Sequence, residues 1–277
     1  MMGLDTGASV WNGMSMPVDA ILFDLDDTLI VDEVVSREAL ASTAKKASMA
    51  CGADAIRLAK DVHRIGSGLW REGPCHPYTK GIGISFHECL WGRFEGDAPE
   101  LTALRNWAVR YRVEVFATAL AEQELPDEDL AEKLAAHFST ERRRLQRLMP
   151  DAVETLVRLK ATHKVALLTN GAPDLQREKI ASSGLGSYFD AIAVSGERGV
   201  GKPKPEIFEM LLADLGVSAD RAVMVGNSLE RDIAGAINAK LAAAIWIQVP
   251  GSEERAEVVP HHTIRGLHEI PALVAGM

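Results

Sequence analysis

The sequence has few cysteines, and their spacing fits neither a disulfide framework nor a metal site. Cys51, Cys75 and Cys89 are the only ones, and no two of them form a C-x-x-C pair. An odd number of widely spaced cysteines is typical of free thiols in a reducing compartment. The chain also lacks any run of about 18 apolar residues, the minimum for a membrane-spanning helix. We therefore expect a cytoplasmic protein.

Positive charge is scarce as well. The 30 lysines and arginines are outnumbered by 39 aspartates and glutamates, which leaves a net charge of −9. Nucleic acids and anionic membranes bind basic surfaces, so this balance argues against both as partners. A small phosphorylated ligand is not excluded, because it needs only one or two local cations. The sequence leaves the oligomeric state open.

The first residues lack the pattern of a targeting segment. "MMGLDTGASVWNGMSM" has no basic start and no long apolar core, so we expect no signal peptide. Glycine, serine and methionine are frequent here, which predicts a flexible leader over residues 1–16.

Short apolar runs are present, and they are continuous rather than alternating. They cover residues 20–23, 165–169, 191–194, 222–226 and 242–249. Continuous runs of this length are typical of strands buried on both faces, as in a parallel sheet. Amphipathic helical patterns follow the second, third and fourth runs. The alternation predicts an α/β fold, a Rossmann-like doubly wound parallel sheet with helices on both sides.

The segment between the first two runs is different, because it is mostly helix-forming. Four amphipathic patterns occupy it, and only the stretch 71–88 reads as irregular. More than a hundred residues are too many for a simple crossover, so we expect an inserted all-helical cap domain at 32–149. The Rossmann-like core would then comprise 17–31 and 150–277. The alternative is that these helices cover the sheet.

Polar side chains follow the apolar runs at the points where the strands should end. In open parallel sheets, ligands bind outside the carboxyl ends of the strands. The first four predicted strands therefore each bring polar groups to one edge of the sheet. Their convergence is stronger evidence for a site than any single motif. The candidate residues are Asp24, Asp26, Thr169, Asn170, Gly171, Lys202, Asn227 and Asp232.

These residue types suit phosphoryl transfer. Of two neighbouring carboxylates, one can be a nucleophile and the other a proton donor, and clustered hard oxygens suit Mg²⁺. Thr169 offers a hydroxyl, and the backbone N–H groups near Asn170 and Gly171 should lie at a helix N-terminus that favours an anion. Lys202 adds a point charge for phosphate or for the nucleophile. Together they indicate an aspartyl-phosphate mechanism.

Four motifs resemble those of the haloacid dehalogenase-like hydrolase superfamily, in the usual order. They are "DLDDTL", "LLTNG", "GKPKPEIF" and "VGNSLERDIAGAINA". The last part of the chain is similar to the phosphatase branch that contains N-acylneuraminate-9-phosphatase and related nucleotidases, and the helical segment resembles that superfamily's first-type cap. The resemblance implies a Mg²⁺-dependent phosphatase of the phosphoric monoester hydrolase class, acting on a small phosphorylated metabolite.

The resemblance also implies a role for each matching position. Asp24 would attack phosphorus and carry the phosphoryl group, and Asp26 would protonate the leaving oxygen and then activate water. Thr169 and Asn170 would hold the phosphoryl oxygens, and Lys202 would bridge phosphate and nucleophile. An acid at position 26 favours a phosphatase over a dehalogenase, because a halide leaves without a proton.

The metal site departs from the superfamily's pattern at one position. Asp24, the backbone carbonyl of Asp26 and Asp232 match it, but Asn227 stands where the fourth motif usually has aspartate. An amide oxygen can bind Mg²⁺ without adding charge, so we expect weaker binding. Two alternatives stay open. The protein is a phosphomutase of the same superfamily, or a catalytically silent metabolite- or partner-binding module if Asn227 abolishes metal binding.

Three other features have plainer interpretations. Asp27 is interpreted as a turn residue whose side chain bonds the local backbone. The basic run at 139–148 is expected to form a solvated helix face near the hinge. Tryptophans and charged residues of the cap, such as Trp91, are more often packing than recognition residues.

Overall fold

The fold is described from a computed structural model, which covers residues 17–249 and 257–277. The leader predicted at 1–16 lies outside these residues. Cys51, Cys75 and Cys89 are free, as expected. Within the described part of the chain, no helix is both long and apolar enough to cross a membrane.

The core of the protein is a six-stranded sheet in which all neighbouring strands are parallel. Its strands are β1 (Ala20–Phe23), β4 (Lys164–Thr169), β5 (Ala191–Val194), β6 (Ala222–Gly226), β7 (Ala243–Ile247) and β8 (His262–Ile264). They are arranged in the order β5-β4-β1-β6-β7-β8. The predicted α/β fold with a doubly wound parallel sheet is therefore confirmed. The sequence reading missed the edge strand β8, where only Ile264 is buried.

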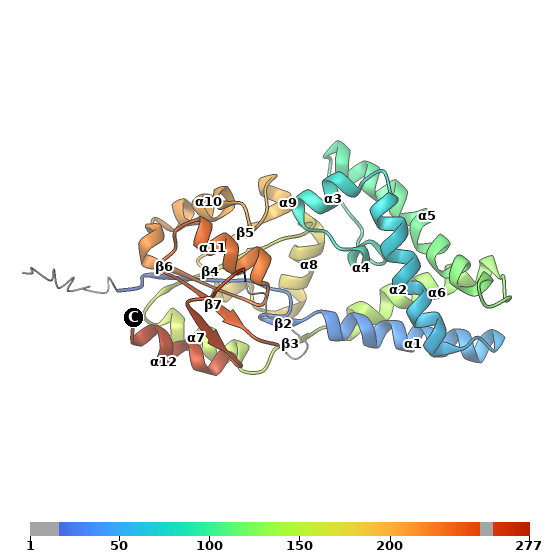
Figure 1. The fold of residues 1–277 in the computed structure, drawn as a ribbon, viewed down its shortest axis with the longest axis horizontal. Coiled ribbons are helices and arrows are strands. Elements are labelled where there is room, and N and C mark those ends of the chain that lie inside the picture. The colour runs from blue at the N-terminus through green and yellow to red at the C-terminus, as the bar shows by residue number, and fades with distance from the viewer. Residues whose placement is uncertain (1–16, 250–256) are drawn as a thin grey trace, which may run out of the picture.

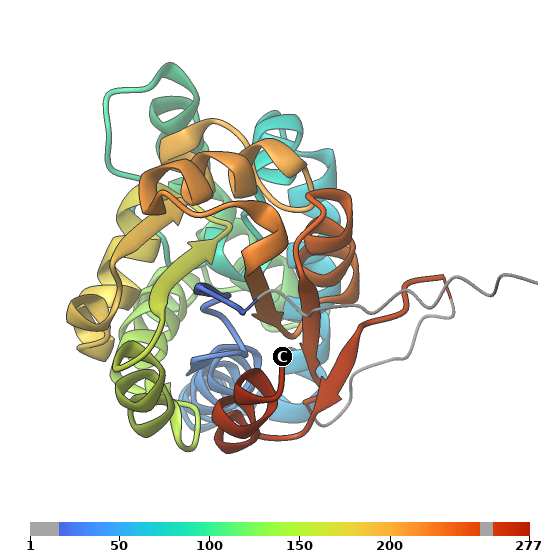
Figure 2. The same ribbon diagram turned by 90° about the vertical axis from the view of Figure 1, so that its left-hand side faces the viewer.

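Both faces of the sheet are covered by helices, which explains the continuous apolar runs. Ile21 and Phe23 pack in one cluster with α7 (Ala152–Lys160) and α12 (Ile270–Ala275). Leu22 faces the other way, toward α10 (Pro205–Leu215) and α11 (Ala234–Asn238). Figure 2 shows the strands between these two layers. The remaining core helices are α8 (Pro173–Ser183), α9 (Ser195–Arg198), η1 (Gly186–Tyr188), η2 (Ala219–Arg221), the π-helical turn η3 (Leu229–Ile233) and η4 (Leu267–Glu269).

Between β1 and β4 the chain leaves the sheet and forms a block of helices, at the right of Figure 1. These are α1 (Glu33–Cys51), α2 (Ala55–Glu72), α3 (His76–Ile82), α4 (Phe86–Cys89), α5 (Pro99–Ala121) and α6 (Glu128–Arg144). The stretch 71–88 was predicted to be irregular, yet it contains α3 and most of α4. Both are too short to show a helical period in the sequence.

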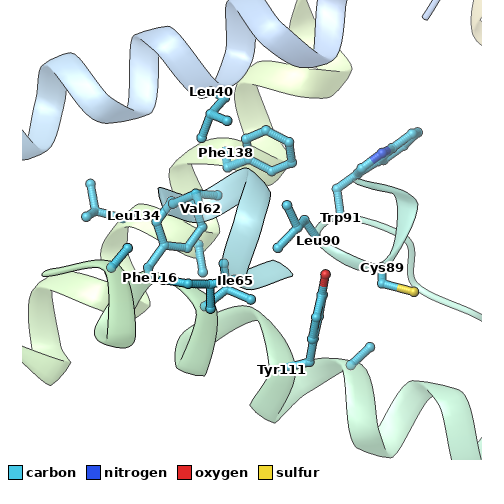
Figure 3. Close-up of a cluster of buried hydrophobic side chains, with 14 of the residues drawn as sticks. Leu40, Val62, Ile65, Cys89, Leu90, Trp91, Tyr111, Phe116, Leu134 and Phe138 are labelled. Carbon is cyan, nitrogen blue, oxygen red and sulfur yellow. The ribbon is translucent and has the colours of Figure 1, made fainter. Parts of the chain in front are cut away.

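The helical block has a hydrophobic cluster of its own. Leu40, Phe116, Leu134 and Phe138 from three different helices meet in its centre (Figure 3). Apart from Ala172 and Leu175, the buried members of this cluster come from residues 39–138. The alternative in which these helices cover the sheet is therefore wrong. The exact boundaries 32 and 149 stay a prediction.

Two connections join the cap to the core, and they pair with each other. β2 (Ile30–Val31) and β3 (Arg147–Leu148) form a small antiparallel ladder, in which Ile30 lies opposite Leu148. The basic run at 139–148 was expected to be helical, but α6 ends within it, at Arg144. Both chain crossings thus lie side by side at the base of the cap (Figure 1).

Candidate active site

A cavity of about 260 Å³ lies where the carboxyl ends of the central strands meet the cap. The strand order places β1 between β4 and β6, where the connections turn toward opposite edges of the sheet, as expected of a ligand site. The predicted residues that line the cavity are Asp24, Asp26, Asn170, Lys202, Asn227 and Asp232. Thr169 and Gly171 do not line it. The cap and the connections contribute Asp27, Asp32, Gly83, Ser85 and Glu88.

Asp24 and Lys202 form the centre of the site. Asp24 directly follows β1, and its backbone N–H donates to the carbonyl of Val225 on β6. The Lys202 ammonium donates to Oδ1 of Asp24 at 2.6 Å and pairs with Oδ1 of Asp232 at 2.7 Å. Burial by itself lowers the pKa of Lys202, but the carboxylates of Asp232 and Asp24 outweigh it and raise the pKa above its ordinary value. Lys202 is therefore charged, and it fixes one oxygen of Asp24.

The second motif, "LLTNG", holds the backbone of Lys202 through Asn170. The Asn170 side chain donates to the carbonyl of Lys202 and accepts from its N–H, both at 2.9 Å. The hydroxyl of Thr169 accepts from Gln176 at 2.6 Å, and the Gly171 N–H donates to Ser195 at 2.8 Å. In this structure the Thr169 hydroxyl and the Gly171 N–H therefore contact other groups of the core, whereas Asn170 lines the cavity. The roles expected of these residues toward phosphate stay predictions.

Asp26 lies in a charge cluster that crosses from the core to the cap, in which Lys179, Arg142 and Glu88 are buried and Asp26 and Asp32 are half-buried. Nζ of Lys179 on α8 is 2.9 Å from both carboxylate oxygens of Asp26 and 3.0 Å from Oε1 of Glu88 in α4. Lys179 also lies 3.3 Å from Asp32, which Arg142 contacts from α6. We call Asp26, Asp32, Glu88, Arg142 and Lys179 the Lys179 cluster. It contains three carboxylates and two cations.

The Lys179 cluster changes the acidity of its members. Burial raises the pKa of Asp26 to about 8; Lys179 opposes the rise, and the carboxylates of Asp32 and Glu88 add to it. Burial also acts to raise the pKa of Asp32, but Lys179 and Arg142 prevail and lower it to about 2. With fewer cations than carboxylates, the cluster favours a proton on Asp26. A carboxylic acid that stays protonated near neutral pH is what a general acid requires.

Arg142 corrects the interpretation of the basic run at 139–148. Its side chain is fully buried, donates to Ser36 at 3.0 Å and pairs with Asp32, and its guanidinium lies 4.8 Å from the ring centroid of Trp91. Only part of the run is a solvated face, as at Arg144. Trp91 is buried beneath Arg142, in keeping with its interpretation as a packing residue.

Asp27 forms the turn that leads into the cap, as interpreted from the sequence. Its backbone is left-handed, with φ of 55°. Its carboxylate accepts from the N–H groups of Asp32 at 2.9 Å and Glu33 at 3.1 Å, at the start of α1. Burial and the nearby Asp32 carboxylate raise the pKa of Asp27 to about 6, although both N–H groups lower it.

The cap rests on the site through the segment between α3 and α4. Ser195 of the core donates its hydroxyl to the carbonyl of Ile82 at 2.6 Å. Gly83 has φ of 83°, and a Cβ there would lie 2.8 Å from Cβ of Asn170. Only glycine fits this close approach. The segment between α3 and α4 thus packs directly against Asn170 of the second motif.

The oxygen donors around the cavity fit a hard cation. Among the described residues, Oδ2 of Asp24 accepts a hydrogen bond only from the Thr28 hydroxyl, at 3.2 Å, and Asn227 follows β6 at the cavity wall. Asp232 is more constrained, because its other oxygen, Oδ2, accepts from the Ser228 N–H at 2.9 Å. Mg²⁺ typically binds one or two carboxylates and keeps several waters. Among the described residues, no group of three or more Asp, Glu, His or Cys side chains is arranged as a ready metal site.

The sequence reading missed Gln176, Lys179 and Glu88. Gln176 donates to Asp26 at 3.1 Å as well as to Thr169, so it links two motifs. A signal for the first two was present, because Gln176, Lys179 and Ile180 share the buried face of α8 at helical spacing. Glu88 gave no signal, since its partner lies on a distant helix.

Comparisons with known proteins agree with this geometry. The model of the haloacid dehalogenase-like hydrolase family matches residues 18–240. A phosphoserine phosphatase of Thermus thermophilus is 38% identical over 251 residues, which cover 90% of this chain and 96% of that protein. Human N-acylneuraminate-9-phosphatase is 31% identical over 270 residues, 93% of this chain and 94% of that one.

A solved structure is similar over the same extent. That of YfnB from Bacillus subtilis superposes with a TM-score of 0.65 at 21% identity, and the match covers 94% of this chain and 99% of that one. It supports the fold of core and cap together. With the family model matching most of its length, this chain belongs to the haloacid dehalogenase-like hydrolases.

Proposed function

We propose that this phosphoric monoester hydrolase is a Mg²⁺-dependent phosphatase that forms an aspartyl-phosphate on Asp24. One observation carries the proposal. The Asp24 carboxylate is held by Lys202 through one oxygen, in a cavity that also contains the protonatable carboxyl of Asp26. A nucleophile and a proton donor at one cavity are the groups that a phosphate monoester requires.

In the first step, Oδ2 of Asp24 attacks the phosphorus atom. The bond from phosphorus to the ester oxygen breaks, and this oxygen takes the proton of Asp26 and leaves as an alcohol. Lys202 keeps Oδ1 in place and balances charge at the phosphoryl oxygens.

In the second step, a water molecule attacks the phosphorus atom of the aspartyl-phosphate. Asp26, now ionised, takes a proton from this water, and the bond between phosphorus and Asp24 breaks. Inorganic phosphate leaves, Asp24 is a carboxylate again and Asp26 is protonated again. The net reaction converts a phosphate ester and water into an alcohol and phosphate.

Asp24, the backbone carbonyl of Asp26 and Asn227 would hold Mg²⁺, with Asp232 acting through a bound water. Asp232 has this indirect part because its oxygens already contact Lys202 and the Ser228 N–H. When bound, Mg²⁺ supplies positive charge that offsets the repulsion between phosphate and Asp24.

A small metabolite is the substrate that the site favours. The cavity is small, and Ser85 and Glu88 of the cap are among the residues that line it. The similar phosphatases are named for phosphoserine and for N-acylneuraminate 9-phosphate, so phosphorylated small acids are the first substrates to test. The predicted cytoplasmic location stays a prediction.

A panel of phosphorylated acids, sugars and nucleotides, with 4-nitrophenyl phosphate as a generic ester, tests the proposal. We expect phosphate release that requires Mg²⁺. Release of labelled phosphate to water, rather than its return to a sugar, separates a phosphatase from a phosphomutase. Wild-type protein that is inactive on the whole panel, and binds no Mg²⁺ at millimolar concentration with a phosphate analogue present, would favour the silent binding module.

A further inference from the structure

Lys179 is a core lysine whose ammonium group lies between the cap and the acid–base carboxylate. Its side chain is fully buried on α8. Nζ lies 2.9 Å from each oxygen of Asp26 on one side and 3.0 Å from Oε1 of Glu88 on the other. A buried ammonium is costly unless carboxylates surround it, so its position is tied to both partners.

Contact with both oxygens restrains how the Asp26 carboxyl group can turn. Gln176 adds a third contact, to Oδ2 at 3.1 Å. A general acid works only within hydrogen-bond reach of the leaving oxygen, so the orientation of this group decides whether a proton is delivered. Asp26 does not set this orientation alone, because its oxygens are held by side chains of α8.

Glu88 is fixed within the cap before it reaches Lys179. Its Oε2 accepts from the Ser85 N–H at 2.8 Å and from the Ser85 hydroxyl at 3.1 Å, as a capping box of α4. Ser85 and Gly83 line the cavity. In this structure the contact between Glu88 and Lys179 thus joins the seated segment of the cap to the core.

We propose that Lys179 is a positioning residue that ties the seating of the cap to the placement of the Asp26 carboxyl group. The inference rests on the proposed function, in which Asp26 is the proton donor. With Glu88 in place, Lys179 is held from both sides and fixes Asp26 toward the leaving oxygen. When the cap lifts, Lys179 loses this partner and water enters the Lys179 cluster. Proton delivery is thereby confined to the enclosed site.

The test compares two leaving groups. Nitrophenolate leaves without a proton, whereas an alkoxide requires one. We expect Lys179→Met to lower kcat/KM for the best alkyl phosphate of the panel at least about tenfold more than for 4-nitrophenyl phosphate. Lys160→Met on α7, which removes a lysine at the surface of the core, is the matched control and should change neither value. Equal losses on both esters would indicate a merely structural role and overturn the inference.

Two further variants keep the test decisive if Lys179→Met does not fold. Glu88→Gln retains an oxygen for Ser85 but removes the charge that faces Lys179. We expect the same selective loss on alkyl phosphates, of smaller size. Lys179→Arg keeps the positive charge and should recover part of the alkyl activity. Glu88→Gln activity that equals wild type on both esters would contradict the coupling to the cap.

A double mutant separates this inference from the proposed function. In an Asp26→Asn background, Lys179→Met should leave activity on 4-nitrophenyl phosphate unchanged, because Lys179 acts through Asp26. A further loss in that background would overturn the inference while the proposed function stands. Wild-type protein that releases no phosphate from any ester would instead refute the proposed function.

Discussion

The Nζ atom of Lys202 lies 2.6 Å from Oδ1 of Asp24, although the two residues are 178 positions apart in the chain. The same ammonium pairs with Asp232 at 2.7 Å. One lysine thus restrains the proposed nucleophile and lies between it and a second carboxylate. Within the part of the chain that the structure describes, Oδ2 of Asp24 has a single long hydrogen bond, from Thr28 at 3.2 Å. The two oxygens of Asp24 therefore differ, because Lys202 holds Oδ1 while Oδ2 is more weakly bound.

Asp24→Asn tests the nucleophile directly. We expect turnover to fall by at least about 10³-fold, because an amide cannot form the acyl phosphate. The variant should remain folded, since Asp232 still compensates Lys202. Phosphate release from 4-nitrophenyl phosphate measures the loss, and circular dichroism checks the fold. Substantial residual activity would show that the nucleophile is misassigned.

Asn227→Asp tests the departure from the metal motif. A carboxylate at this wall of the cavity adds charge to the donor set, so Mg²⁺ should bind on the order of tenfold more tightly. The Mg²⁺ dependence of turnover and calorimetry both measure this change. Asn238→Asp, at the exposed end of α11, adds the same charge elsewhere and should leave Mg²⁺ affinity unchanged. An unaltered affinity in Asn227→Asp would place the metal away from this residue.

Arg142 and Arg144 form a matched pair for stability, because they lie two positions apart on α6. Arg142→Met leaves Asp32 with one cation fewer in a buried cluster, so the free energy of unfolding should fall by about 3–5 kcal/mol. Arg144→Met breaks an exposed pair with Glu141 and should change little. Urea unfolding compares the two. Similar stabilities would contradict the burial of Arg142.

His87 predicts a pH dependence of cap stability. Burial, with a smaller contribution from His63, lowers the pKa of His87 to about 4 from its ordinary 6.5. Between pH 6.5 and pH 4, His87 binds a proton in the unfolded chain but not in the folded cap. This contribution to the free energy of unfolding is therefore fully present above pH 6.5 and is lost as the pH falls toward 4. At pH 5 the cost is about 2 kcal/mol.

His87→Gln removes this titration. We compare the free energy of unfolding of His87→Gln with that of wild type by urea unfolding at both pH values. The difference should shift in favour of the variant by about 2 kcal/mol when the pH is lowered from 7.5 to 5. His262→Gln on the edge strand β8 is the control for the substitution itself. The same difference between His87→Gln and wild type at both pH values would mean that His87 is protonated in the folded protein at pH 5.

The strands of the core were predictable because burial on both faces leaves a direct signal. β1, β5 and β6 have the bounds of their apolar runs. β8 was missed, because an edge strand with one buried residue has no such run. The ladder of β2 and β3 was missed because each strand has only two residues, and their pairing joins the two ends of the cap.

The charged residues of the cap were the least predictable. In the sequence, Arg142 stands in a run of three arginines that looks like a solvated face. Its burial depends on Asp32 and Ser36 at the start of α1 and on Trp91 after α4, two other places in the chain. A charged side chain can be buried when tertiary packing places an opposite charge beside it. The sequence of a single segment does not show whether a distant segment provides that charge.

The sequence by itself determined the parallel sheet, the inserted helices and the residues at the strand ends, because apolar runs and motif spacing are local properties. Only the tertiary structure decided what these residues contact. In it Lys202 contacts Asp24, and the ammonium of Lys179 contacts both Asp26 and Glu88 of the cap. These contacts join distant segments, and their energies depend on burial that exists only once the cap and the core have packed together.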